Sequence, residues 1–151
     1  MPNWCDNNLY ISHPEKKMMK KALNAWNKGK FLSTLVPEPD YTEVKVKPTF
    51  PINSATGEPK PEFVDPETAW YDWRIQNWGT KWDIGWENYQ DKAKLSGDHD
   101  MFVNFQSAWS PPTDAYATLI EMGYSIRAYY FEGGCAFCGR WEDGIEDLYN
   151  L

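Results

Sequence analysis

The 151-residue sequence predicts an α+β fold in which two helices cover one face of an antiparallel sheet. Two observations predict it. Segments that alternate between apolar and polar residues are separated by segments with helical spacing. Five of the nine tryptophans also lie between Trp70 and Trp86, and each tryptophan buries on the order of 200 Å². A chain of this length suits one domain, residues 1–151, that buries roughly 68–70% of its unfolded surface.

The N-terminal part predicts a strand followed by a helix. Residues 4–11 form the strand, with Leu9 and Ile11 on one face. The helix follows up to about residue 28, because apolar residues recur at helical spacing along it. Its start has capping-box spacing, and Gly29 ends it. The apolar stripe consists of Met19, Ala22, Leu23 and Trp26.

A proline-rich insertion, about residues 36–79, follows. Seven of the eleven prolines lie between residues 36 and 66. We read the segment as an insertion because neither side of it alone completes a sheet. Residues 42–47 resemble a short edge strand with Val44 and Val46 directed inward. An N-cap, a proline and an acid at residues 65–67 predict an extra helix that ends near Trp78, with Gly79 as its left-handed cap.

The C-terminal part predicts strands at 84–89 and 101–107 and a helix from Ser110 through Met122. A hairpin over 124–141 follows, and then an acidic helix or tail over 142–149. Without the insertion and the last strand, the order is βαββαβ, which is the ferredoxin-like split βαβ unit.

The hairpin defines two faces. A two-residue turn at Gly133-Gly134 sets Glu132 opposite Cys135 and Arg127 opposite Arg140. One face is apolar and is expected to join the core: Ile126, Ala128, Tyr130, Phe137 and Trp141. The other face carries Arg127, Tyr129, Phe131, Cys138 and Arg140.

The second face supplies the candidate binding residues, which are Arg127, Tyr129, Phe131 and Arg140. Two opposed arginines repel each other unless an anion lies between them. This favours binding of an anionic group or an RNA base that stacks on the two rings. The alternative is structural: an acid neutralises the arginines, and the insertion covers the aromatic rings.

Six tryptophans are expected to form a structural aromatic core. They are Trp70, Trp73, Trp78, Trp82, Trp86 and Trp109.

The composition limits the function classes. The net charge of −7 argues against broad binding to a phosphate backbone. No apolar run is long enough to cross a membrane, and the start resembles no signal peptide. Three cysteines form no even framework, which fits a reducing compartment. We therefore expect a soluble protein in the cytoplasm.

No catalytic signature is present, so we expect no catalytic residues, although a carboxylate pair brought together by folding stays an alternative. Cys135 and Cys138 have metal and redox spacing. The hairpin register directs them to opposite faces, so we expect buried thiols, no metal and no cofactor.

Four motifs resemble one family. They are residues 1–7 (MPNWCDN), 77–83 (NWGTKWD), 105–112 (FQSAWSPP) and 130–134 (YFEGG). In this order they resemble the YubB ferredoxin-like family of phage and plasmid proteins. The resemblance implies a ferredoxin-like fold and an origin in a mobile element. It implies no activity and no site residues.

Three function hypotheses follow. The first is a non-enzymatic interaction protein of a phage or plasmid that binds a host protein, such as a defence or replication component, in the bacterial cytoplasm. The second is a single-stranded nucleic-acid binder that uses the aromatic sheet face, which the net charge opposes. The third is a small enzyme that acts on an anionic substrate near Arg127 and Arg140.

Overall fold

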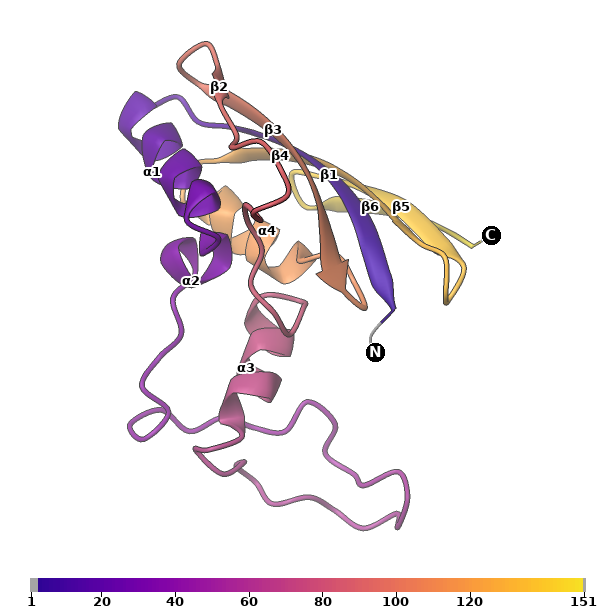
Figure 1. The fold of residues 1–151 in the computed structure, drawn as a ribbon. Coiled ribbons are helices and arrows are strands. Elements are labelled where there is room, and N and C mark those ends of the chain that lie inside the picture. Colours follow the sequence, from indigo (N-terminus) through magenta and orange to yellow (C-terminus); the bar gives the residue numbers. More distant parts are fainter. Residues whose placement is uncertain (1–2, 151) are drawn as a thin grey trace.

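The structure is a computed structural model that describes residues 3–150, and it has the predicted α+β fold. Within these residues there are four helices and six strands (Figure 1). The helices are α1 (Lys16–Asn27), α2 (Phe31–Leu35), α3 (Ala69–Asn77) and α4 (Thr113–Glu121). The strands are β1 (Trp4–Ser12), β2 (Leu95–Ser96), β3 (Asp100–Ala108), β4 (Ser125–Glu132), β5 (Phe137–Glu142) and β6 (Ile145–Asn150). Met1 and Pro2, which begin the first family motif, lie outside the described residues.

All neighbouring strands of the sheet are antiparallel, in the order β2-β3-β1-β4-β5-β6. Strand β1 lies inside the sheet between β3 and β4, and the helices α1 and α4 lie on the same side of it (Figure 1). Helix α1 follows β1 in the chain, and α4 connects β3 to β4. This arrangement is consistent with a ferredoxin-like fold that β5 and β6 extend at one edge.

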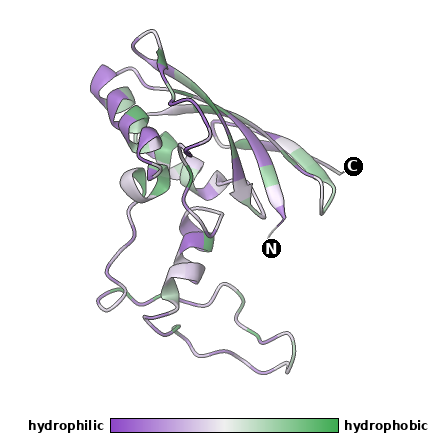
Figure 2. Ribbon diagram, viewed as in Figure 1, coloured by the Kyte–Doolittle hydropathy of each residue, from purple (hydrophilic) through white to green (hydrophobic). Residues whose placement is uncertain are grey.

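The core lies between the helices and one face of the sheet. Strands β1, β3 and β4 alternate strictly between buried and exposed residues over most of their length. Figure 2 shows both hydrophobic and hydrophilic residues on the strands of the sheet. The predicted stripe of α1 largely holds, because Met19, Ala22 and Trp26 are buried, while Leu23 packs against the core from its rim. On the strands the buried residues include Leu9, Ile11, Val103, Phe105, Ile126 and Ala128.

The predicted strand at 84–89 is wrong, because this segment bonds to helix α1 instead of to the sheet. The backbone N–H of Trp86 donates to the carbonyl of Trp26 at 2.7 Å. Further along, Asn27 forms two hydrogen bonds with the backbone of Ala93, at 2.8 and 3.1 Å. The chain joins the sheet only at β2, which has two residues.

Two other element predictions are also corrected. Residues 42–47 form no strand; Val46 is buried, but Val44 is exposed. The acidic segment after residue 142 is the strand β6 and not a helix or tail, because a turn at Asp143 and Gly144, both with positive φ, folds it back along β5. Gly79 has the predicted left-handed conformation, with φ of +85°.

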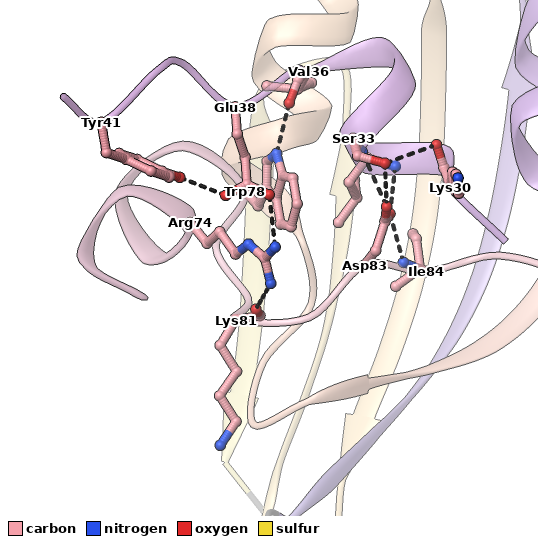
Figure 3. A network of polar contacts seen from close by, with 11 residues as sticks. Lys30, Ser33, Val36, Glu38, Tyr41, Arg74, Trp78, Lys81, Asp83 and Ile84 are labelled. Atoms are coloured by element: carbon pink, nitrogen blue, oxygen red, sulfur yellow. Dashed lines mark hydrogen bonds and ion pairs between the residues drawn. The ribbon is translucent and has the colours of Figure 1, made fainter. Parts of the chain in front are cut away.

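The insertion is attached to the core by polar contacts around Trp78 and Arg74 (Figure 3). The indole N–H of Trp78 donates to the carbonyl of Val36 at 2.9 Å. The guanidinium of Arg74 donates to Glu38 at 2.6 Å and to the carbonyl of Lys81 at 3.0 Å. Burial alone would raise the pKa of the Glu38 carboxyl, but the bonds from Arg74 and Tyr41 outweigh it and hold this pKa below its usual range.

The expected aromatic core holds only in part. Trp78 is completely buried, and Trp73 and Trp86 pack against the core from its rim. Trp70, Trp82 and Trp109 are exposed, which corrects the expectation for these three. Trp82 and Trp109 pack instead around the Lys81 ammonium, which lies 4.5 and 5.7 Å from the centres of their rings.

Candidate interaction surface

The β4–β5 hairpin has a four-residue loop, residues 133–136, in place of the predicted two-residue turn. Glu132 therefore lies opposite Phe137, and Arg127 lies opposite Glu142. The Glu132 carboxylate explains the longer loop, because it accepts the backbone N–H groups of Gly134 and Cys135, both at 2.7 Å. The predicted register is wrong by two residues.

A shift of two residues keeps every side chain on its predicted face, because side chains alternate with period two. Ala128, Tyr130 and Trp141 are buried, and the rings of Tyr130 and Phe137 are 6.1 Å apart. The candidate residues Arg127, Tyr129, Phe131 and Arg140 all point to the side of the sheet without helices, and each is exposed.

The strand registers define that side, which we call the open face. It consists of Trp4, Asp6, Asn8, Tyr10 and Ser12 of β1; Ser96 of β2; Asp100, Phe102, Asn104 and Gln106 of β3; Ser125, Arg127, Tyr129 and Phe131 of β4; Cys138, Arg140 and Glu142 of β5; and Ile145, Asp147 and Tyr149 of β6.

Aromatic rings lie side by side across the middle of the open face. The rings of Tyr10 and Phe102 are 4.4 Å apart, and those of Tyr10 and Tyr129 are 6.4 Å apart. These three side chains and Phe131 are 38–46% exposed. Amide side chains lie beside the rings: Asn104 donates to Asn8 at 2.6 Å, and Gln106 donates to Asp6 at 2.9 Å.

The two arginines of the open face do not face each other, so the argument for an anion between them is wrong. The Arg127 guanidinium lies over the Tyr10 ring, 4.4 Å from its centre. Arg140 pairs with Glu142, and this bond raises the pKa of Arg140. Both cations therefore already have partners on the sheet itself.

The insertion does not lie over the open face. It extends from the helix side and hangs beside α3, away from the strands (Figure 1). The exposure of the central aromatic rings agrees with this placement. The aromatic side chains therefore face solvent, and the structural alternative in which the insertion covers them is wrong.

Sequence analysis missed Tyr10 and Phe102, the two rings at the centre of the open face. A signal for them was present. Once Leu9 and Ile11 are placed inward, alternation directs Tyr10 outward, and the inward Val103 does the same for Phe102.

The three cysteines differ in exposure. Cys5 is buried, Cys135 is exposed and Cys138 is intermediate, so the expectation of buried thiols at Cys135 and Cys138 is wrong. Burial raises the pKa of the Cys5 thiol to about 12. Within residues 3–150, no group of three or more histidine, cysteine or acidic side chains is placed to hold a metal ion.

Replacing Glu132 with glutamine should make the free energy of unfolding fall less steeply as the pH is lowered. Burial raises the pKa of Glu132, but the backbone N–H groups of Cys135 and Gly134 outweigh it and hold this pKa below its usual value. The carboxylate therefore stabilises the fold at neutral pH, and this contribution is lost as the pH falls through the folded-state pKa. Urea unfolding at a series of pH values from neutral to about pH 3 measures the free energy of unfolding of both proteins. The difference between wild type and variant should become smaller as the pH falls. A difference that stays constant over this range would contradict the assignment.

Comparisons of the sequence and the structure with known proteins found no match. No family model matches the sequence, and neither the curated proteins nor the solved structures contain a match. Among the described residues, no helix combines the length and apolar character needed to cross a membrane.

Proposed function

We propose that this protein is a non-enzymatic interaction protein that binds another protein through the open face of its sheet. One observation carries the proposal: no segment among residues 3–150 lies over the open face, and exposed aromatic rings lie at its centre. An exposed apolar patch of this kind on a soluble domain is typical of an interaction site.

The composition of the open face supports a protein partner. The chain has twelve lysines and three arginines. Two of the arginines lie on the open face, and none of the lysines does. Tyrosine, tryptophan, phenylalanine and arginine are enriched in protein interfaces, and lysine is depleted. With four carboxylates against two arginines, this face also lacks the positive charge that phosphate groups require.

The family resemblance supports the rest of the proposal. Its motifs point to a phage or plasmid origin, so the proposed partner is a protein of the bacterial host cell. Defence and replication components are the classes to test first. We expect the complex with such a host protein to form in the bacterial cytoplasm.

A pull-down from bacterial lysate tests the proposal. The wild type should recover a stoichiometric protein that the double variant Tyr10→Ala/Tyr129→Ala loses, because hot-spot aromatic residues contribute about 2 kcal/mol or more each. The matched control is Phe50→Ala/Tyr71→Ala, which removes two exposed aromatic side chains outside the open face. Recovery of no protein, or equal loss in both variants, would overturn the proposal.

A second candidate is binding of single-stranded nucleic acid. The observation that favours it is the pair of Tyr10 and Phe102 rings on adjacent strands, with amide side chains beside them, because stacked bases use such platforms. Fluorescence anisotropy with labelled oligodeoxythymidine separates the two candidates. If the wild type binds the oligonucleotide and the Tyr10→Ala/Tyr129→Ala variant does not, nucleic acid is the favoured ligand. If the wild type does not bind the oligonucleotide at low salt, this second candidate is excluded.

A further inference from the structure

The outer edge of β3 lacks a strand partner along most of its length. Strand β2 pairs only with Asp100 and Met101. At the other end, the carbonyl of Ala108 accepts the hydroxyl of Thr80 at 2.9 Å. Between these points the neighbouring chain is bonded to α1, as described above, and not to β3.

The hydrogen bonds that flank the β1–β3 ladder show which backbone groups point outward. The N–H of Trp109 donates to Asn3, and the N–H of His13 donates to His99, both in the register of the ladder. Because bonded and non-bonded pairs alternate in an antiparallel ladder, the odd-numbered residues of β3 bond to β1. The N–H and C=O groups of the even-numbered residues Phe102, Asn104 and Gln106 therefore point away from the sheet. The register of β2 places Lys94 opposite Phe102. Within residues 3–150, no hydrogen bond is found to the outward backbone groups of Asn104 and Gln106.

A groove runs beside this unpaired edge. Its first part has a volume of about 730 Å³ and lies between β3, Trp26 and the segment 90–94. A second hollow of about 420 Å³ lies along β3 towards Gln106, between Tyr89 on the outer side and Asp6 and Asn8 of β1 on the inner side. The two hollows share Gln90 and Asn104 as lining residues, so they meet at the unpaired edge beside Asn104.

Strand β3 also lacks the features that protect a sheet edge. Natural edge strands usually carry lysine, proline or a bulge, but residues 101–109 contain no charged residue and no proline. The outer wall of the groove carries Lys92 and Lys94 against a single acid, Asp91. The unpaired edge is therefore uncharged, and it lies beside a wall with net positive charge.

We propose that this edge binds an extended segment of a partner protein, which adds as a strand beside β3. About five residues at 3.4 Å each match the free length. Alternate side chains of the segment face Trp26 and Val103 and should be apolar, and a carboxylate is expected near Lys92 and Lys94. Strand addition of this kind takes its affinity from main-chain hydrogen bonds. The wall at 90–94 favours a single segment over the sheet edge of a second copy.

A phage-displayed library of random dodecapeptides, selected on the full chain, tests the proposal. Selected peptides should bind wild type and Asn104→Ala with similar affinity. Their affinity for Asn104→Pro should be lower by a factor of at least about ten. Proline removes the outward N–H that the peptide needs and leaves the backbone ladder to β1 intact, since the backbone N–H of Asn104 does not donate to β1. Asn104→Ala is the matched control, because it removes the same side chain and its bond to Asn8.

Amide hydrogen exchange on the wild type gives a second readout that does not depend on folding of the proline variant. A bound peptide should slow exchange at the backbone amides of Asn104 and Gln106. Enrichment of no peptide, equal binding to both variants, or unchanged exchange at these amides would each overturn the proposal. A dimer in solution in which the amides of Asn104 and Gln106 are already protected would also overturn it. Because both variants keep Tyr10 and Tyr129, failure here is separable from failure of the open-face proposal.

Discussion

Replacing Trp78 with alanine should lower the free energy of unfolding by about 3–5 kcal/mol. The side chain is completely buried, and the ring of Trp73 lies 5.9 Å from its own. Its indole N–H also holds the carbonyl of Val36, which begins the insertion. For a protein of this size, Tm should fall by roughly 6–20 °C. Thermal and urea unfolding measure both quantities.

Trp82→Ala is the matched control for this prediction. The Trp82 side chain is 40% exposed and touches Trp4 and Lys81 at the surface. Its loss should cost about 1 kcal/mol or less. An equal decrease in the free energy of unfolding for the two variants would contradict the tight packing of Trp78 in the core.

Asp83→Ala should lower the free energy of unfolding by about 3 kcal/mol, because this carboxylate connects the start of α2 to the segment after α3 (Figure 3). It accepts the backbone N–H groups of Leu32 and Ser33 at the start of α2, at 2.7 and 3.2 Å. It also accepts the Ser33 hydroxyl at 2.6 Å and the N–H of Ile84 at 2.8 Å. Alanine leaves these donors without an acceptor, and Asp83→Asn should have an intermediate effect. Urea unfolding of both variants checks this order.

The control for Asp83 is Asp98→Ala, which removes a surface ion pair with Lys16. Exposed pairs contribute about 0.5 kcal/mol or less, so this variant should unfold close to wild type. A loss at Asp83 no larger than the loss at Asp98 would contradict the role of Asp83 as the connection between α2 and the segment after α3.

Sequence patterns predicted the elements whose partners are local or periodic. The stripe of Met19, Ala22 and Trp26 marked α1, and alternation marked β1, β3 and β4. Residues 84–89 were misplaced because their alternation matches a strand, while their hydrogen-bond acceptor, the carbonyl of Trp26, lies on a helix far away in sequence. No local pattern carries that information.

For the candidate surface, the face of each residue was predictable, but its neighbours were not. The four candidate residues lie on one face as predicted: Arg127, Tyr129, Phe131 and Arg140. A register shift of two residues leaves each side chain on the same face, because side chains alternate with period two. Their pairing depended on the Glu132 carboxylate, which extends the hairpin loop from two residues to four. Trp82 and Trp109 were placed in the core from residue type alone, although Lys81 lies over both rings at the surface.

Hydroxyl-radical footprinting of the free protein tests most directly whether the open face is available to a partner. The side chains of Tyr10, Phe102 and Tyr129 should be modified quickly, while the buried Tyr116 and Trp78 should stay protected until the protein unfolds. If the three open-face rings were as protected as Tyr116, another part of the chain or a second copy would cover them, and the proposed binding surface would not exist.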